Sequence, residues 1–143
     1  MSSIGHIAVT TKDMDASMDF YTKAMGFKKA FEINNPKTGE PWIIYLHVGK
    51  GQFLELFYNG TIENPWNGKL TGLNHICIQV DDIFSSTKRI EEAGYAMDSQ
   101  PTQGTDLNWQ SWVKDPDGVR IELMQLDEAS PQIKYLKENS NEA

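Results

Sequence analysis

Two stretches of the chain repeat one phrase: LNHICIQVDD at residues 73–82 and SIGHIAVTTKD at residues 3–13. Aligning them places His75 on His6. Each histidine begins an alternation of branched aliphatic residues with small or polar ones, which is typical of a strand with one buried face. Repetition of this kind indicates a duplicated structural unit, so the sequence predicts one unit present twice.

A helix is predicted after each of these strands. Asp13 and Asp82 fall on each other in the alignment and have the residue type that caps helix N-termini. Residues at helical spacing follow, and a glycine ends each pattern, as expected at a helix C-terminus. The positions are Met14, Met18, Tyr21, Met25 and Gly26 in the first copy, and Ile83, Thr87, Ile90 and Gly94 in the second.

Each copy then ends in a predicted hairpin. WIIYLHVGKGQFLELF, residues 42–57, aligns without a gap on WQSWVKDPDGVRIELM, residues 109–124. Turn residues occupy both centres, with glycines in the first and Asp-Pro-Asp-Gly in the second. A short further strand is expected before each hairpin, at residues 27–33 and 95–99. Each copy is therefore predicted to be a βαβββ unit.

The fold class that follows is α+β. The two repeats span residues 4–58 and 73–126 of a single domain, residues 1–143, with a polar C-terminal tail at 127–143. This length suits one domain with a sizeable core. Two βαβββ units can pair into one curved mixed sheet with the helices on its convex side, and residues 59–72 serve as the linker.

Composition excludes several classes of partner. The net charge is -7, from 20 acidic and 13 basic residues, and no Lys/Arg cluster is present to bind a nucleic-acid backbone. No apolar run approaches the ~20 residues of a membrane span, and the N-terminus lacks a secretory signal pattern. The single cysteine, Cys77, cannot form an intrachain disulfide, so we expect a cytoplasmic protein.

Strand alternation places the histidines on the face that points away from the helices. Ile7 and Val9 have the side chains that a helix covers, so the neighbouring histidine points the other way. In the first hairpin Leu54 and Leu56 face the helix, which leaves the glutamate between them on the opposite face. One concave surface is thus predicted to hold His6, Glu55, His75 and Glu122, with Arg120 and Met124 beside them.

Two histidines and two carboxylates form a donor set for a divalent metal. Taken singly, each is an ordinary polar residue of a strand, but duplication of both types at matched positions favours a site. Imidazole and carboxylate suit Ni, Zn, Co, Mn or Fe, and the sequence does not select among these metals. Cys77 shares the face of His75 and is interpreted as a small buried thiol.

The sequence resembles the vicinal oxygen chelate superfamily, which includes glyoxalase I, bleomycin- and fosfomycin-resistance proteins, extradiol dioxygenases and methylmalonyl-CoA epimerase. The resemblance covers about residues 4–126. The segments on which the resemblance rests are GHIAVTTKDMDASMDFYTKAMGF, FLELFYNG, LNHICIQVDD and WVKDPDGVRIELMQ. The ligand order His, Glu, His, Glu is similar to that of glyoxalase I (lactoylglutathione lyase), whereas resistance proteins and dioxygenases do not normally use the position of Glu55.

This resemblance implies a metal-dependent lyase or isomerase with one divalent ion per site. Its substrate is the hemithioacetal of methylglyoxal and a thiol such as glutathione, and its product is an S-lactoyl thioester. Glu122 is the expected base and Glu55 its partner on the opposite face of the substrate. Asn59 matches the family's contact to the glutamyl part of glutathione. The resemblance also implies a homodimer with sites at the interface.

The sequence departs from glyoxalase I where that family binds glutathione carboxylates. Thr10 stands at a position that is basic in the family, and between Ile90 and Val119 the only basic residue is Lys114. Two alternatives therefore stay open: an epimerase or isomerase of another substrate with vicinal oxygens, and a non-catalytic resistance protein that binds a small ligand. A dioxygenase is disfavoured, because Glu55 would occupy a coordination position that oxygen needs.

Further residues are candidates for lining the substrate pocket. Two phenylalanines share the face of Glu55, although aromatic residues in strands also serve ordinary packing. The predicted substrate-binding residues are Asn59, Phe53, Phe57, Thr10, Gln79 and Trp109.

Overall fold

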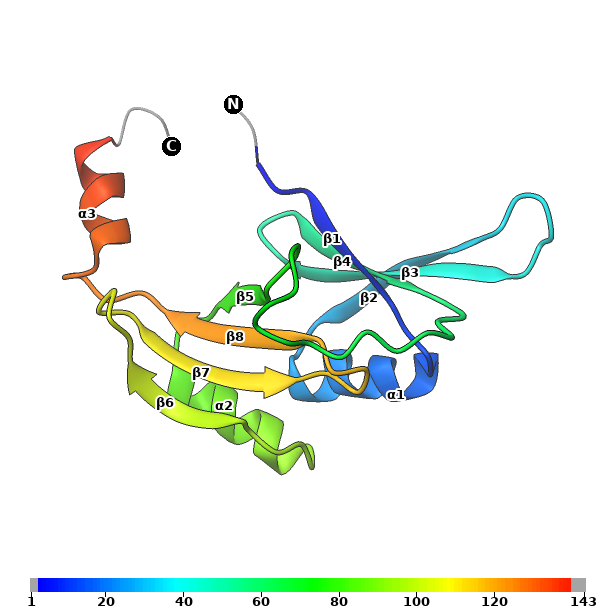
Figure 1. The fold of residues 1–143 in the computed structure, drawn as a ribbon. Coiled ribbons are helices and arrows are strands. Elements are labelled where there is room, and N and C mark those ends of the chain that lie inside the picture. The colour runs from blue at the N-terminus through cyan, green and yellow to red at the C-terminus, as the bar shows by residue number, and fades with distance from the viewer. Residues whose placement is uncertain (1–2, 140–143) are drawn as a thin grey trace. The chain divides into compact units, whose positions relative to one another are not determined.

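The computed structural model of the chain describes residues 3–139. The chain divides between Pro65 and Trp66 into two compact units, and each contains one of the predicted repeats (Figure 1). Both units have the predicted order of strand, helix and three strands, so the α+β class with two βαβββ repeats is confirmed.

In the N-terminal unit the four strands hydrogen-bond in the order β1-β4-β3-β2. The first pair is parallel and the other two pairs are antiparallel. The strands are β1 (His6–Thr10), β2 (Lys28–Asn34), β3 (Pro41–Gly49) and β4 (Gln52–Phe57).

The C-terminal unit repeats this arrangement, with strand order β5-β8-β7-β6 and a parallel first pair. The equivalent order in both units confirms the duplication, while the joining of the two sheets into one curved sheet stays a prediction. The strands are β5 (Ile76–Gln79), β6 (Ser99–Gln103), β7 (Trp109–Lys114) and β8 (Arg120–Gln125), and the helix is α2 (Ile83–Glu92).

The position of β6 corrects the sequence prediction, which placed this strand at residues 95–99. The ladder with β7 begins at Ser99, and the strand reads Ser-Gln-Pro-Thr-Gln. Such a polar sequence containing Pro101 is suited to the edge of a sheet, where one side of the strand needs no partner. The strand lacks the apolar alternation by which the other strands were recognised.

The first helix also differs from its prediction as one regular element. It consists of α1 (Met14–Asp19) followed by a π-helical segment, η1 (Phe20–Ala24). The Met25 amide donates to the carbonyl of Phe20 at 3.0 Å, which is the wider spacing of a π-helix. This turn brings Phe20 and Tyr21 into the core together, whereas the expected Met14 and Met18 are only half-buried.

Asp82 caps α2 as predicted. Its Oδ1 accepts hydrogen bonds from the amides of Phe84 at 2.9 Å and Ser85 at 3.1 Å. Ile83, Thr87 and Ile90 of this helix are buried, also as predicted.

We predict that Asp82→Ala lowers the free energy of unfolding by about 1 kcal/mol, because two amides lose their acceptor. Urea denaturation monitored by circular dichroism measures the loss. Asp81→Ala is the matched control, since Asp81 is an exposed acidic residue just outside the helix. Equal losses in both variants would contradict a capping role.

The turn before β8 is held by Asp115. Its Oδ1 accepts from the amides of Asp117 at 2.9 Å and Val119 at 2.8 Å, and Gly118 takes a positive φ of 84°. This turn fixes the register in which Trp112 of β7 lies opposite Glu122 of β8.

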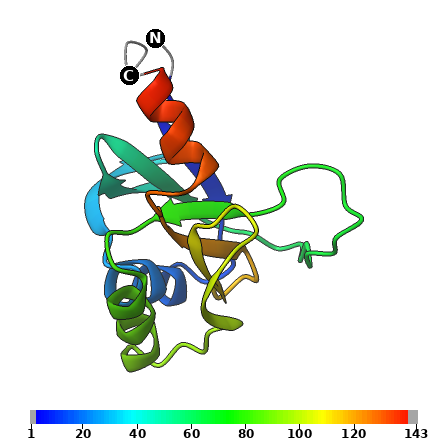
Figure 2. The ribbon, with the colours of Figure 1, turned by 90° about the vertical axis from the view of Figure 1, so that its left-hand side faces the viewer.

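The C-terminal segment contains a helix where only a polar tail was expected. Figure 2 shows this helix, α3 (Pro131–Glu138), in red. Ser130 caps it by accepting from the Ile133 amide at 3.3 Å, and proline stands in its first turn. This Ser-Pro start is a recognised helix signal. Within residues 3–139, no helix is long and apolar enough to cross a membrane.

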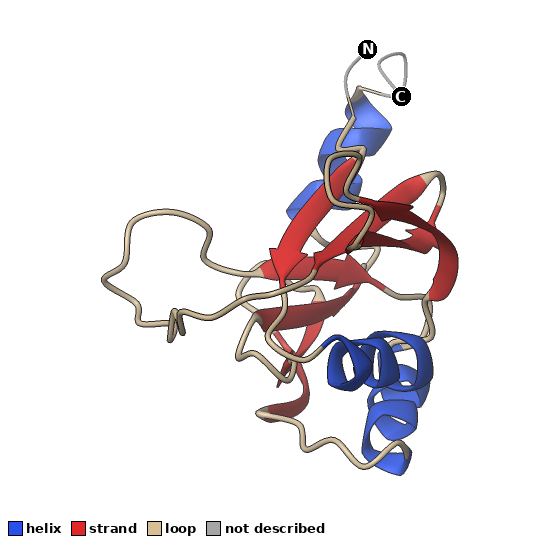
Figure 3. Cartoon of the chain, turned by 90° about the vertical axis from the view of Figure 1, so that its right-hand side faces the viewer, coloured by secondary structure: helices blue, strands red, loops and turns tan. Residues whose placement is uncertain are grey.

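The segment between β4 and β5 is loop throughout (Figure 3, tan). Its side chains include several large exposed hydrophobic residues: Ile62, Trp66, Leu70 and Leu73.

Candidate functional site

The N-terminal unit brings together the first predicted His–Glu pair. His6 lies on β1 and Glu55 on the neighbouring β4, with their Nε2 and Oε1 atoms 3.6 Å apart. The Glu55 side chain is only 7% exposed, whereas the His6 side chain is 56% exposed. A nearly buried carboxylate therefore lies beside an accessible imidazole in this unit.

Tyr45 contacts Glu55 from the next strand, β3, where the two residues are register partners. The pKa of Tyr45 is raised, first because its hydroxyl hydrogen-bonds the Glu55 carboxylate, and further by desolvation and the negative charge of Glu55. Phe31 stacks on the Tyr45 ring at 4.3 Å between centroids. Tyr45 thus restrains Glu55, a role that the sequence analysis missed.

The other predicted residues of this unit lie around the pair. Phe53 is the register partner of His6, and Phe57 that of Thr10, so both flank Glu55 along β4. Thr10 is exposed at the end of β1. Asn59 is exposed just beyond β4 and takes a positive φ of 69°, a conformation that asparagine tolerates well.

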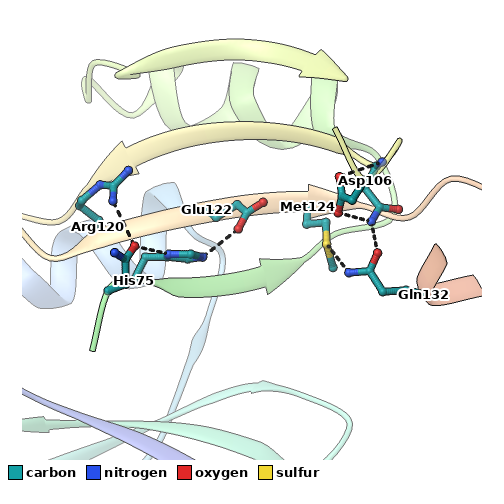
Figure 4. A network of polar contacts seen from close by, with 8 residues as sticks. His75, Asp106, Arg120, Glu122, Met124 and Gln132 are labelled. Atoms are coloured by element: carbon teal, nitrogen blue, oxygen red, sulfur yellow. Dashed lines mark hydrogen bonds and ion pairs between the residues drawn. The ribbon is translucent and has the colours of Figure 1, made fainter. Parts of the chain in front are cut away.

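The C-terminal unit brings together the second predicted pair (Figure 4). The Nε2 of His75 is 3.0 Å from Oε2 of Glu122, and the two side chains are 30% and 16% exposed. On the other side of the ring, Nδ1 of His75 is 2.8 Å from Oδ1 of Asn74. An amide oxygen only accepts, so a proton on Nδ1 would satisfy this contact, and Nε2 would then be the ring nitrogen available to a metal.

Arg120 also contacts Asn74, with its Nη1 donating to the amide oxygen at 3.3 Å. Its Cζ lies 3.9 Å from the centre of the Trp66 ring and 4.5 Å from that of Trp112. The Trp112 ring in turn packs edge-on against His75 at 4.8 Å. Strand alternation predicted Arg120 on this face but indicated no function for it.

Two predictions for this unit are corrected. Cys77, expected to be buried, is exposed as a whole residue, while partial desolvation of its thiol and, second, the negative charge of Glu122 raise its pKa to about 12. Trp109 was expected to line the pocket, but its ring packs on Phe84 of α2, 5.4 Å away. Trp109 shares the helix-facing side of β7 with the buried Ser111. Trp112 lies opposite Glu122 instead.

Gln79 is exposed on β5 and is the register partner of Met124. It therefore lies on the same face as Glu122, two register positions along the sheet.

Each pair offers one imidazole nitrogen and one carboxylate, which are suitable donors for a divalent ion. Within residues 3–139, no three His, Cys, Asp or Glu side chains gather closely enough to hold a metal ion. A metal site normally has at least three protein ligands, so neither pair alone completes one.

Comparison with known proteins agrees with this architecture. The sequence profile of the Glyoxalase/Bleomycin resistance protein/Dioxygenase superfamily matches residues 3–123. The chain is 34% identical to a "Probable lactoylglutathione lyase" of Vibrio parahaemolyticus, over 87% of this chain and 91% of that protein. It is 29% identical to a lactoylglutathione lyase of Escherichia coli O157:H7, over 87% and 93% of the two chains.

The fold is also similar to that of a trypanothione-dependent glyoxalase I of Leishmania major. The TM-score is 0.73 at 23% identity, with complete coverage of both chains. The chain therefore belongs to the glyoxalase/bleomycin resistance protein/dioxygenase superfamily.

Proposed function

We propose that the protein is a metal-dependent lyase of glyoxalase I type, which isomerises the hemithioacetal of methylglyoxal and a thiol to an S-lactoyl thioester. The observation that carries the proposal is the occurrence of two His–Glu pairs on equivalent strands of duplicated units. Relatives named lactoylglutathione lyase that match most of the chain support it.

His6, Glu55, His75 and Glu122 would hold the metal, with His75 oriented through Asn74. A bound divalent ion supplies Lewis-acid stabilisation of the negative charge that develops on the substrate oxygens. Because each unit carries two of the four ligands, we further propose a homodimer with sites at the interface. The cytoplasmic location expected from the single cysteine stays a prediction.

The unequal surroundings of the two carboxylates divide their roles. Glu55 is restrained by Tyr45 and nearly buried, so it serves as the fixed partner. Glu122 is more exposed and has no tyrosine opposite it, so a substrate can reach it and we assign it the role of base. It removes the proton from the carbon bonded to sulfur and returns it to the neighbouring carbon, so that the overall change is an isomerisation.

The proposal leaves the thiol component of the substrate unassigned. Thr10 is exposed at the position where glutathione-dependent relatives carry a basic residue. The Leishmania major enzyme is described as trypanothione-dependent, so the thiol differs among proteins of this fold. An isomerase or epimerase of another vicinal-oxygen substrate is the second candidate, favoured by Thr10.

The test uses one preparation that is stripped with a chelator and reloaded separately with Ni, Zn, Co or Mn. Ultraviolet absorbance then follows thioester formation from methylglyoxal and glutathione. We expect turnover only in metal-loaded protein. Stoichiometric metal binding without turnover would reject this substrate and favour the second candidate, and absence of metal binding would contradict both.

A further inference from the structure

The guanidinium of Arg120 is held between two indole rings. Its Cζ lies 3.9 Å from the ring centre of Trp66, in the loop between β4 and β5, and 4.5 Å from that of Trp112 on β7. Stacking of a planar guanidinium on aromatic faces combines cation–π attraction with van der Waals contact, and it restricts rotation of the side chain. The directions in which Arg120 can donate hydrogen bonds are therefore restricted as well.

One of these donors meets the side-chain amide of Asn74. Nη1 of Arg120 donates to Oδ1 of Asn74 at 3.3 Å, and the same oxygen is 2.8 Å from Nδ1 of His75. Figure 4 shows the contacts on both sides of this amide, with Arg120 and His75 labelled. A carbonyl oxygen has two lone pairs, so it can accept from both neighbours at once.

The partners of the Asn74 amide decide which of its ends faces His75. The acceptor end and the donor end of an asparagine amide have nearly equal shapes, so only hydrogen bonds distinguish the two orientations. Imidazole does not select one, because each ring nitrogen can either donate or accept. A guanidinium has donors only, and it therefore requires the oxygen of Asn74. With the oxygen in this place, a proton on Nδ1 of His75 satisfies the contact.

The opposite end of the His75 ring faces a second acceptor, since Nε2 is 3.0 Å from Oε2 of Glu122. A neutral imidazole carries one proton, so the Asn74 oxygen and the Glu122 carboxylate compete for it. A metal ligand needs an unprotonated nitrogen, and Nε2 is the nitrogen that lies beside another proposed ligand. A group that favours the proton on Nδ1 therefore favours metal binding at Nε2.

We propose that Arg120 is a positioning residue, which orients the Asn74 amide so that His75 carries its proton on Nδ1 and presents Nε2 to the metal. The inference rests on the proposed function, because it assumes the metal site. Trp66 and Trp112 keep the guanidinium in place, so the loop between β4 and β5 contributes to the site without supplying a ligand. The competing explanation is that Arg120 only anchors this loop to the sheet.

Metal affinity tests the proposal with a variant that makes Arg120 unnecessary. Arg120→Met should weaken Zn binding by about tenfold, as loss of an outer partner of a ligand does. An ionised aspartate has acceptors only, so Arg120→Met/Asn74→Asp should bind Zn as tightly as Asn74→Asp alone. A residue that only anchors the loop would give the same loss in both backgrounds, and competition with a chromophoric chelator measures all four affinities.

Arg120→Lys should retain most of the affinity, because lysine also has donors only. Lys114→Met is the matched control, since Lys114 is an exposed basic residue of the same hairpin that pairs with Asp98, and its affinity should equal that of the unmodified protein. Circular dichroism checks folding, and Arg120→Gln replaces Arg120→Met if the latter does not fold. An unchanged affinity in the folded Arg120 variant, or a loss that persists in the double variant, would overturn the proposal.

Nitrogen NMR of the histidine rings separates this inference from the proposed function, because it needs no metal. The chain has 3 histidines, so comparison with His75→Ala assigns the signals of His75. Spectra are recorded on metal-free Glu122→Leu, which lacks the competing acceptor, at a pH where the rings are neutral. We expect the proton on Nδ1 of His75, both tautomers when Arg120→Met is added, and Nδ1 again when Asn74→Asp is added as well.

This pattern of tautomers in a protein that neither binds metal nor turns over substrate would reject the lyase and leave the orientation of His75 by Arg120. Metal-dependent turnover together with an unchanged tautomer after Arg120→Met would reject the positioning role and leave the lyase.

Discussion

Glu122→Gln is expected to lower kcat by about 10²–10⁴-fold, the usual contribution of a general base. Glutamine keeps the shape of the side chain and one oxygen that can face His75 but cannot take a proton. The side chain is 16% exposed, so this isosteric change should alter the free energy of unfolding by no more than about 1 kcal/mol. Steady-state kinetics and urea denaturation measure the two effects separately.

The control is Glu40→Gln, which removes one exposed carboxylate in the segment between β2 and β3. It should leave both kcat and stability unchanged. Glu55→Gln provides the comparison within the site, because loss of the restrained partner should weaken metal binding as well as turnover. Full activity in Glu122→Gln would remove Glu122 from the mechanism and transfer the role of base to Glu55.

His75→Ala is expected to abolish tight metal binding, since it deletes one of the four proposed ligands. Asn74→Ala leaves all four ligands but removes the group that orients the His75 ring. Loss of such an outer partner typically costs about 10–100-fold in metal affinity. Asn74→Ala should therefore weaken metal binding less than His75→Ala does. Competition with a chromophoric chelator gives both dissociation constants.

His47→Ala is the control, because His47 is exposed on β3 and its ring contacts Phe53. Its metal affinity should equal that of the unmodified protein. If His75→Ala bound metal as tightly as His47→Ala, the four-ligand assignment would be wrong. If Asn74→Ala had no effect, its contact with His75 would not orient a ligand.

Much of the fold could be predicted from the sequence, because duplication doubles each weak signal. The alternation in β1 and β5 indicated which side chains face the helices, and the burial of Val9 and Ile76 agrees with it. The same alternation correctly placed each histidine beside its glutamate. The same pattern at matched positions in both copies is far less expected by chance than the pattern in one copy. The prediction of which face each side chain occupies was therefore reliable.

The wrong predictions concern residues whose contacts depend on partners distant in the sequence. β6 is a polar edge strand that pairs with β7 without presenting an apolar pattern of its own. Trp109 and Trp112 are three residues apart in one strand, so they point to opposite faces, and only the register with β8 shows which one meets Glu122.

The restraining residues were missed for a related reason. Tyr45 reaches Glu55 from the neighbouring strand of the same hairpin, and Asn74 becomes informative only once its amide is seen between His75 and Arg120. No spacing rule marks either residue as a partner of a ligand.

The two copies present the same pair of ligands in unlike surroundings. Tyr45 lies across from one glutamate and Trp112 across from the other, while Ala8 and Cys77 occupy the equivalent positions on the parallel strands. In a site formed by both pairs, the two glutamates would therefore have different neighbours. In the proposed lyase, a proton moved by Glu122 alone would reach a single side of the planar intermediate, so the divergence of the two repeats would set the handedness of the product.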